Sequence, residues 1–261
     1  ISAAEHTMAL ILALSRNVSY GHDGISRGEW NRHMLIGSEL HDKTIGIVGL
    51  GKIGREVMQR SKAFNMNILG YDPFIPSDFF RQDEVHICDL DYLIKNSDFI
   101  TLHIPLTNET KNLFDYKNLV KMKKEARIIN VARGGIINED DLSKVLKENK
   151  ISGAALDVFE SEPLDNNSPL ISAPNIILTP HLGASTKEAK ESVSISICNQ
   201  VKNFLINEEL DNAINIPFNS FSHLKDIAPF LQLSGLLGNI HSQVADGPIK
   251  KISISCYGNI N

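Results

Sequence analysis

Short apolar runs alternate with helical patterns along most of the sequence. The apolar runs predict buried strands at residues 43–50, 67–71, 99–104, 126–131, 153–158 and 175–178. Helical periodicity lies between them, as in 53–64 and 138–148. In the second of these, Asn138 is the expected N-cap, and an apolar stripe is formed by Leu142, Val145 and Leu146. Apolar strands that alternate with helices predict a doubly wound α/β fold, with helices on both faces of a parallel sheet.

The start of the chain carries a further helical pattern. Residues 8–14 are apolar, Ser2 is the expected cap and Glu5 stands at the capping-box spacing. The apolar run is too short to cross a bilayer, which needs about 20 residues, and no basic leader precedes it. We therefore expect a buried helix here, without a membrane span or a signal peptide. A chain that opens at a helix cap is expected to be a fragment of a longer polypeptide.

The end of the chain departs from the strand–helix alternation. A long helix is expected at 186–206, and the pattern turns polar near residue 211. From 231 onward a Leu/Gly-rich helical pattern precedes an alternating strand at 249–260. This change predicts the start of a second, C-terminal α+β domain.

Composition narrows the classes of function. The 261 residues, of which 42% are hydrophobic, can bury a substantial core and are expected to form more than one domain. The net charge of −5 argues against a broad nucleic-acid-binding face. Cys88, Cys198 and Cys256 are odd in number and far apart. They give no support for a metal site or a disulfide framework, and they fit a reduced, cytoplasmic protein.

A glycine-rich loop follows the first predicted strand. Gly49, Gly51 and Gly54 match the GxGxxG pattern between a strand and a helix, and Asp72 ends the next strand. This context predicts a Rossmann-like dinucleotide site, in which the helix N-terminus receives the pyrophosphate and Asp72 receives the ribose hydroxyls. A carboxylate at that place repels a 2′-phosphate, which favours NAD over NADP. The alternative is an ordinary glycine turn, with Asp72 as a turn residue before Pro73.

Three residues at the ends of later apolar runs are the candidate catalytic groups. Arg133 can grip a substrate carboxylate with its two-pronged guanidinium. His181 can accept a hydroxyl proton as a hydride leaves for a nicotinamide. Glu162 can fix the imidazole tautomer and favour its protonated form. Taken singly, each has a structural alternative: a salt-bridged arginine beside a helix, a surface acid before Pro163, and a hydrogen-bonded histidine at a strand end.

Five segments together resemble the D-isomer-specific 2-hydroxyacid dehydrogenases: GLGKIGREV, YDP, VARGGIINEDDL, ALDVFESEPL and TPHLGASTKEA. Within this family, three segments are similar to the long-form phosphoglycerate dehydrogenase branch: HLGASTKEA, NAINIP and LSGLLGNIHSQVADGPIKKISI. The resemblance covers essentially the whole chain. It implies catalysis by Arg133, Glu162 and His181, with NAD as the cofactor.

The resemblance also implies a set of binding residues. The implied NAD contacts are Gly49, Gly51, Lys52, Ile53, Gly54, Asp72, Ile104, Pro105, Val131, Ala132, Arg133, Asp157, His181, Leu182, Gly183 and Ala184. Asp157 is expected to reach the nicotinamide carboxamide, and Arg133 to bind the substrate. Arg32 falls where the family places a basic residue that helps with the substrate phosphate; a structural loop arginine is the alternative.

The resemblance further implies three parts of the chain. Residues 1–183 would form the NAD-binding domain, 184–210 a helix that returns to a substrate-binding lobe, and 211–261 the start of an intervening domain. Most of the substrate lobe would precede the first residue. We therefore expect this polypeptide alone to bind NAD and to turn over poorly or not at all.

The implied reaction is the NAD-dependent oxidation of 3-phospho-D-glycerate to 3-phosphohydroxypyruvate, the first step of L-serine biosynthesis. Two alternatives remain: a dehydrogenase for another D-2-hydroxy acid, such as lactate, glyoxylate or hydroxypyruvate, and a non-catalytic, NAD-responsive module like the corepressors of this fold. The implied partners are a small phosphorylated 2-hydroxy acid and further copies of the chain, joined through the nucleotide-binding domain, with no nucleic acid and no membrane.

Overall fold

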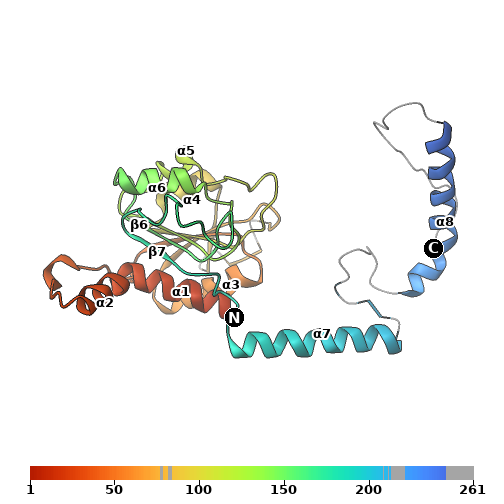
Figure 1. Cartoon of the computed structure of the whole chain (residues 1–261), viewed down its shortest axis with the longest axis horizontal. Coiled ribbons are helices and arrows are strands. Elements are labelled where there is room, and N and C mark those ends of the chain that lie inside the picture. The colour runs from red at the N-terminus through yellow and green to blue at the C-terminus, as the bar shows by residue number, and fades with distance from the viewer. Residues whose placement is uncertain (77–78, 82–83, 208, 211, 213–220, 245–261) are drawn as a thin grey trace. The chain divides into compact units, whose positions relative to one another are not determined.

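The computed structural model describes residues 1–76, 79–81, 84–207, 209–210, 212 and 221–244 (Figure 1). The chain divides into two units, Ile1–Lys190 and Glu191–Asn261. The predicted strand at 249–260 and Cys256 lie outside the described residues. The candidate site residues all belong to the first unit.

The first unit is built on a sheet of seven parallel strands. They are β1 (Thr44–Val48), β2 (Asn67–Tyr71), β3 (His86–Ile87), β4 (Phe99–Leu102), β5 (Arg127–Asn130), β6 (Gly153–Leu156) and β7 (Ile176–Leu178). Their order in the sheet is β3-β2-β1-β4-β5-β6-β7, and every neighbouring pair is parallel. The strand order reverses direction between β1 and β4, as in the dinucleotide-binding folds. The prediction of a doubly wound, Rossmann-like sheet is confirmed.

Helices cover both faces of this sheet, because its strands carry apolar side chains on both sides. The helices of the first unit are α1 (Ser2–Ser15), α2 (Val18–Ser26), η1 (Arg32–Met34), α3 (Lys52–Ala63), α4 (Leu90–Asn96), α5 (Tyr116–Leu119) and α6 (Glu139–Lys147). On one face, α1 and α3 pack with Ile45 and Ile47 of β1 in one apolar cluster. On the other face, α4, α5 and α6 pack in a second cluster with Ile100 and Ile128 (Figure 1). Full burial of one such side chain contributes about 1.5–3 kcal/mol.

Side-chain caps fix where several helices begin. Asn138 accepts a hydrogen bond from the backbone N–H of Asp141 and caps α6, as predicted. Asp89 caps α4 in the same way. The prediction for α1 was wrong, because Ser2 is its first helical residue, Ile1 holds the cap position and no side-chain cap bond forms there. The Ser2 hydroxyl instead lies 3.0 Å from the Thr186 hydroxyl.

The strand predicted at 67–71 has these bounds in the structure, and the other five predicted strands are shorter than their apolar runs. The first run, 43–50, yields Thr44–Val48, and the run 99–104 yields Phe99–Leu102. Leu50 remains fully buried although it has left the ladder. An apolar run predicts burial and not strand pairing. The first residues after these strands are buried beside the sheet but form no pairs in it, so the runs overestimate the strand lengths. The short β3 and the helices α4 and α5 were not predicted.

Two long helices lie at the end of the described chain. They are α7 (Lys187–Asn207), where a helix was predicted at 186–206, and α8 (Phe221–Val244), which contains Pro229. Apolar side chains of α7 are exposed, among them Val193, Ile195 and Leu205. Among the described residues, no helix is long and apolar enough to span a membrane.

Candidate functional site

The carboxyl ends of five strands meet in register at one edge of the sheet. Paired across the ladder are Val48 with Leu102, Leu102 with Asn130, Asn130 with Leu156, and Leu156 with Leu178. The residue after each strand therefore starts a loop at the same edge: Gly49, His103, Val131, Asp157 and Thr179. In a doubly wound sheet, ligands bind outside this edge, at the point where the strand order reverses.

The glycine loop has the geometry of a phosphate cradle. Gly49 has a φ of +96°, and a Cβ there would lie 2.5 Å from the His103 carbonyl oxygen. A Cβ on Gly54 would lie 2.0 Å from the Gly49 carbonyl oxygen, so only glycine lets α3 approach β1 this closely. Gly51 stands at the N-cap of α3, and a Cβ there would meet no atom within 4 Å. The space in front of Gly51 and the free N–H groups of α3 fit a pyrophosphate.

Asp72 holds the glycine loop and the turn after β2 through its two carboxylate oxygens. Its Oδ2 accepts a hydrogen bond of 2.9 Å from the Leu50 N–H, and its Oδ1 accepts one of 3.0 Å from the Phe74 N–H. A carboxylate oxygen has further acceptor capacity, so Asp72 can still receive ribose hydroxyls. The bond to Phe74 is the turn role that the sequence left open for Asp72, whereas the bond to Leu50 was not predicted. The ribose role stays a prediction. Lys52 and Ile53, at the start of α3, are exposed.

A buried asparagine shapes the turn that presents Arg133. The Asn130 side-chain amide donates to the Arg133 carbonyl at 2.9 Å, and its oxygen accepts from the Ala132 N–H at 3.0 Å. Gly134, which follows Arg133, packs so closely on the loop after β6 that a Cβ would lie 1.8 Å from the Phe159 carbonyl oxygen. The exposed Arg133 guanidinium donates to the Ala132 carbonyl at 2.7 Å. Its position is thus set by the backbone around it.

Glu162 and His181 form the pair that the sequence predicted. The Nδ1 of His181 lies 2.7 Å from Oε2 of Glu162, and the other oxygen of Glu162 accepts from the Phe159 N–H at 3.0 Å. The hydrogen bond from His181 is the main cause that lowers the pKa of Glu162 below its ordinary value of 4.5. Because an ionised carboxylate only accepts hydrogen bonds, Nδ1 carries the proton and Nε2 offers a lone pair. The imidazole is half exposed and can reach a ligand.

The backbone at His181 is held in an uncommon conformation. Its φ is +54°, in the left-handed region, which costs a non-glycine residue about 1–3 kcal/mol. Its N–H lies 2.9 Å from the Asp157 carbonyl oxygen and 3.0 Å from that of Thr179, and donates to both. The fully buried Asp157 carboxylate accepts from the N–H groups of Leu182 and Gly183, both at 2.8 Å. We call residues 179–184 the His181 loop; Asp157 fixes its course.

Contacts between the loops join the turn that carries Arg133 to the segments that carry Glu162 and His181. Gly134 packs on Phe159, whose N–H binds Glu162. A Cβ on Gly183 would lie 2.9 Å from the Val131 side chain, which ties the His181 loop to the strand end before Arg133. The predicted contact of Asp157 with a carboxamide stays a prediction, since its carboxylate is buried among protein donors.

The remaining predicted residues differ in their surroundings. Ile104 is half-buried, whereas Pro105 and Ala184 are exposed at the same edge.

Sequence reasoning missed His103, which follows β4. Its Nε2 lies 3.0 Å from the Thr101 hydroxyl, and burial lowers the pKa of its imidazole to about 4. His103 is therefore neutral at physiological pH.

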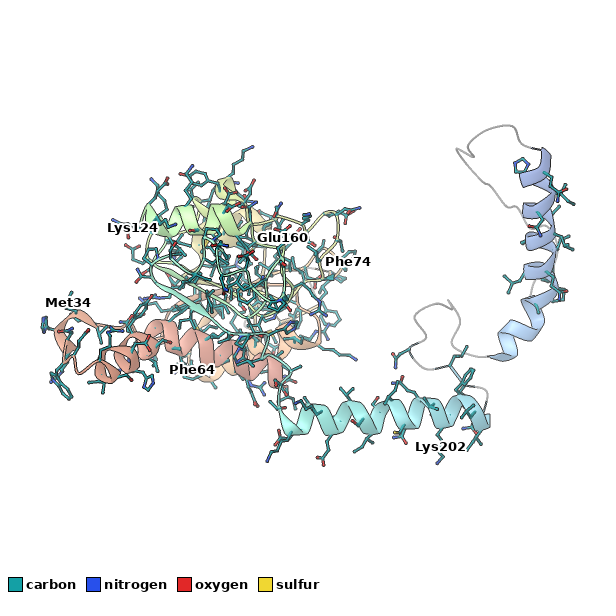
Figure 2. The ribbon with its side chains drawn as sticks, in the orientation of Figure 1. Met34, Phe64, Phe74, Lys124, Glu160 and Lys202 are labelled. Atoms are coloured by element: carbon teal, nitrogen blue, oxygen red, sulfur yellow. The ribbon has the colours of Figure 1, made fainter. Side chains whose placement is uncertain are left out.

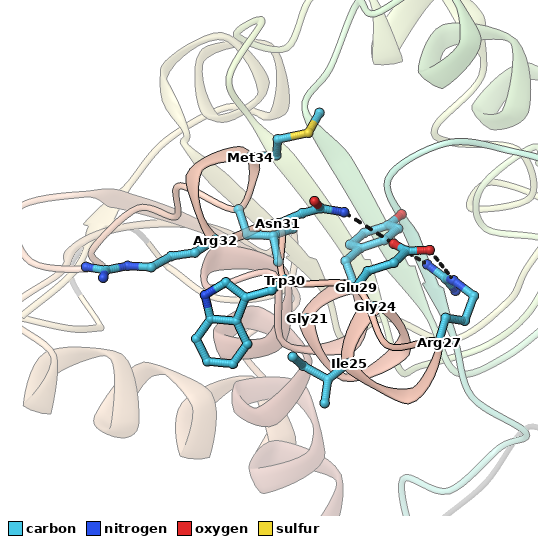
Figure 3. A pocket seen from close by; sticks show the side chains of 11 residues that line it. Gly21, Gly24, Ile25, Arg27, Glu29, Trp30, Asn31, Arg32 and Met34 are labelled. Atoms are coloured by element: carbon cyan, nitrogen blue, oxygen red, sulfur yellow. Dashed lines mark hydrogen bonds and ion pairs between the residues drawn. The ribbon is translucent and has the colours of Figure 1, made fainter.

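Arg32 lies in a different part of the first unit. It belongs to η1, and Met34 in that helix lies at the end of the unit opposite to Phe74, which follows Asp72 (Figure 2). Arg32 helps to line a cavity of about 590 Å³ between α2 and η1, together with Tyr20 and Trp30. Its guanidinium extends away from the Arg27–Glu29 ion pair in that cavity (Figure 3). Within one chain, Arg32 is not brought to the His181 loop, and its predicted phosphate role remains a prediction.

No group of three or more metal-ligating side chains occurs among the residues that the structure describes. The donors at this edge of the sheet are backbone N–H groups and the side chains of Lys52, Arg133 and His181, which suit an anionic organic ligand.

Comparison with known proteins agrees with this geometry. Residues 8–183 match the model of the D-isomer specific 2-hydroxyacid dehydrogenase family, NAD binding domain. The chain belongs to this family. The resemblance found in the sequence is thus confirmed, and NAD is the cofactor of the domain, in agreement with the open space before Gly51 and the free N-terminus of α3.

Similar proteins extend over the whole chain. The D-3-phosphoglycerate dehydrogenase of Methanocaldococcus jannaschii is 44% identical over 261 residues, which are 100% of this chain and 50% of that protein. The enzyme of the same name from Synechocystis is 43% identical over 260 residues, 100% of this chain and 47% of the relative. The chain therefore spans about half the length of the curated relatives it matches.

Solved structures of this family are also similar. The NAD-dependent formate dehydrogenase from Staphylococcus aureus, in complex with NAD, is 36% identical with a TM-score of 0.75, over 81% of this chain and 63% of that one. The D-lactate dehydrogenase from Aquifex aeolicus, in complex with NAD and lactic acid, is 31% identical with a TM-score of 0.71, over 78% and 66%.

Proposed function

We propose that this chain is part of an NAD-dependent oxidoreductase that converts 3-phospho-D-glycerate to 3-phosphohydroxypyruvate, the first step toward L-serine. The observation that carries the proposal is the Glu162–His181 pair, 2.7 Å apart, at the same sheet edge as the glycine loop. Relatives named for this reaction match the whole chain at 44% and 43% identity, which supports the substrate.

The residues at the sheet edge can divide the reaction between them. NAD, when bound, accepts the hydride from the carbon that carries the hydroxyl group. Nε2 of His181 takes the hydroxyl proton, and ionised Glu162 stabilises the resulting imidazolium through Nδ1. Arg133 forms paired hydrogen bonds to the substrate carboxylate and draws electron density from the adjacent oxygen. The backbone contacts of Asn130 hold Arg133 in place for this contact.

A panel of substrates tests the proposal against the other D-2-hydroxyacid dehydrogenases. The full-length protein is assayed for NADH formation with 3-phosphoglycerate, and with D-lactate and glycolate at equal concentration. We expect kcat/KM for 3-phosphoglycerate to exceed the other values by 100-fold or more, on the order of the discrimination that a lost polar contact gives. Equal or greater turnover of an unphosphorylated acid would overturn the substrate assignment. No turnover of any acid by a protein that binds NAD would favour the non-catalytic module.

The domain organisation also forms part of the proposal. We assign residues 1–183 to NAD binding, 184–210 to a helix that packs on a substrate-binding lobe, and 211–261 to the start of an intervening domain. The exposed apolar side chains Val193, Ile195 and Leu205 of α7 support a packing role for this helix. For the chain alone, we expect NAD binding with little or no turnover, which calorimetry and an NADH assay on the same sample measure.

Self-association is the third part of the proposal. The segment from α2 to η1 exposes Trp30, Met34 and Ile36, with 80%, 74% and 84% of their surface accessible. Such an apolar surface favours an interface between copies of the chain. Light scattering after gel filtration measures the mass, and Trp30→Glu should halve the mass of a dimer; an unchanged mass would argue against this surface.

We also propose a cytoplasmic location, for which the free thiols of Cys88 and Cys198 provide support.

A further inference from the structure

The N-terminal turns of α1 contact the His181 loop at Gly183 and also its neighbours Thr186 and Asp157. Three contacts lie one turn apart or less. The Ser2 hydroxyl lies 3.0 Å from that of Thr186, and Ala3 lies 3.7 Å from the place where a Gly183 Cβ would be. Nε2 of His6 lies 3.1 Å from Oδ1 of Asp157. Helix α1 is thus part of the support of the catalytic loop, although it is far from that loop in the sequence.

The His6 imidazole completes the set of donors around a buried carboxylate. Asp157 is fully buried, and its oxygens receive the Thr179 hydroxyl and the N–H groups of Leu182 and Gly183. His6 adds a fourth donor, to the same oxygen Oδ1 that accepts from Thr179 and Leu182, and its side chain retains 19% exposure. Its Nε2 also lies 3.2 Å from the Thr179 hydroxyl oxygen.

The chemistry of the acceptors fixes the tautomer of His6. A carboxylate can only accept, so Nε2 of His6 must carry the hydrogen. The Thr179 hydroxyl donates its own hydrogen to Asp157, which leaves its lone pair to accept from the same His6 N–H. The Nε2–H of His6 therefore contacts both Thr179, the first residue of the His181 loop, and Asp157, whose carboxylate binds the N–H groups of that loop.

We infer that His6 is a positioning residue of this dehydrogenase, which orients Asp157 and Thr179 and thereby holds His181 at its working position. The inference rests on the proposed function of His181 as the proton acceptor. The strained backbone at His181, with φ at +54°, needs such support, because it relaxes if the hydrogen bonds around Asp157 weaken. The Glu162–His181 pair would then lose its alignment with a bound hydroxy acid.

Two substitutions at His6 separate the hydrogen bond from the bulk of the side chain. His6→Leu keeps apolar volume and removes the donor, and His6→Gln replaces Nε2–H by an amide N–H at a similar reach. His41→Leu is the matched control, because His41 is exposed and contacts Asp42 at the surface. Thr179→Val removes the hydroxyl that donates to Asp157. Circular dichroism shows whether each variant is folded, and Thr179→Val replaces His6→Leu in the test if His6→Leu is unfolded.

Hydrogen–deuterium exchange of the full-length proteins measures how well the backbone amides of the His181 loop are protected. We expect the amides of Leu182 and Gly183 to exchange about tenfold faster or more in His6→Leu, and to return toward the wild-type rate in His6→Gln. We expect kcat to fall about tenfold in His6→Leu, with KM for NAD within twofold of wild type and partial rescue by Gln.

The two readouts separate this inference from the proposed function. If the wild-type protein shows no turnover, the reaction is wrong, whereas the exchange rates still test the role of His6. Unchanged exchange at Leu182 and Gly183 in folded His6→Leu, or in Thr179→Val if His6→Leu is unfolded, would overturn the inference. So would an equal loss of kcat in His6→Leu and His6→Gln, since that result would mean the donor does not matter.

Discussion

Replacing Glu162 by Gln tests the proton-transfer pair with almost no change in shape. The carboxylate lies 2.7 Å from Nδ1 of His181, and a hydrogen bond to a charged group contributes about 1.5–3 kcal/mol. The imidazole is 50% and the carboxylate 36% exposed, so solvent screening reduces this value to about 1–2 kcal/mol. Glu162→Gln in the full-length protein should therefore lower kcat about five- to thirtyfold.

The pH profile sharpens the same experiment. The pKa of Glu162 is lowered from 4.5 in the folded protein, so the carboxylate stays ionised across the neutral range. The stabilisation from the pair is present above pH 4.5 and is lost only as the pH falls through the lower folded value. Between pH 5 and 9, protonation of Glu162 should therefore contribute nothing to the pH dependence of kcat. Below pH 4.5, kcat of the wild-type protein should lose the contribution of the carboxylate, and Glu162→Gln, which has no group to protonate there, should not show this loss.

A control on the same loop excludes a general effect of lost charge. Glu160 lies 3.7 Å from Lys111, and both side chains are more than half exposed, so Glu160→Gln should leave kcat unchanged at every pH. We would measure kcat for wild type, Glu162→Gln and Glu160→Gln from steady-state NADH formation at a series of pH values. A folded Glu162→Gln protein with wild-type kcat would refute the assignment of Glu162.

Three further predictions concern the rest of the site. His181→Ala in the full-length protein should lower kcat about 100-fold or more and spare NAD affinity, measured by calorimetry; an intact kcat would exclude His181 as the base. Asp72→Ala should weaken NAD binding and relax the bias against NADP, since the carboxylate and the acceptor for Leu50 are both lost; unchanged NADP affinity would contradict this. Gly54→Ala should lower the free energy of unfolding by about 1–3 kcal/mol, measured in urea, because its Cβ would press on a carbonyl oxygen. Gly51→Ala should leave stability unchanged and weaken NAD binding, and equal stability of the two variants would refute the packing argument.

The sheet could be predicted from the sequence because its strands are buried on both faces. All six strands predicted between residues 43 and 178 are present, and each lies within the apolar run that predicted it. The ends were placed too far along, since Leu50, Val131 and Val158 are buried in loops beside the sheet. The strand His86–Ile87 could not be found, because two residues carry no period, and it is fixed only by pairing with β2.

The sequence predicted those site residues whose type is required by proton transfer. Glu162 and His181 were predicted as a pair and lie within hydrogen-bond distance. Asn130 and His6 were missed, because an asparagine at a strand end and a histidine on a buried helix have common structural roles. The sequence does contain one signal for Asn130: a polar side chain that ends an apolar strand and stands three residues before Arg133.

The division between exposed and buried polar residues explains how one site can be both reactive and fixed. Arg133 and His181 are exposed and can meet a ligand, yet each lies on a turn held by a buried side chain, Asn130 or Asp157. Removal of the Asp157 carboxylate would leave four donors without their acceptor, at about 1–3 kcal/mol for each buried one. Loss of the His181 imidazole would leave only Glu162 without its partner, in partial contact with solvent. Asp157 therefore stabilises the His181 loop, and His181 carries its chemistry. Substitutions at Asp157 should change both stability and turnover, whereas substitutions at His181 should change turnover alone.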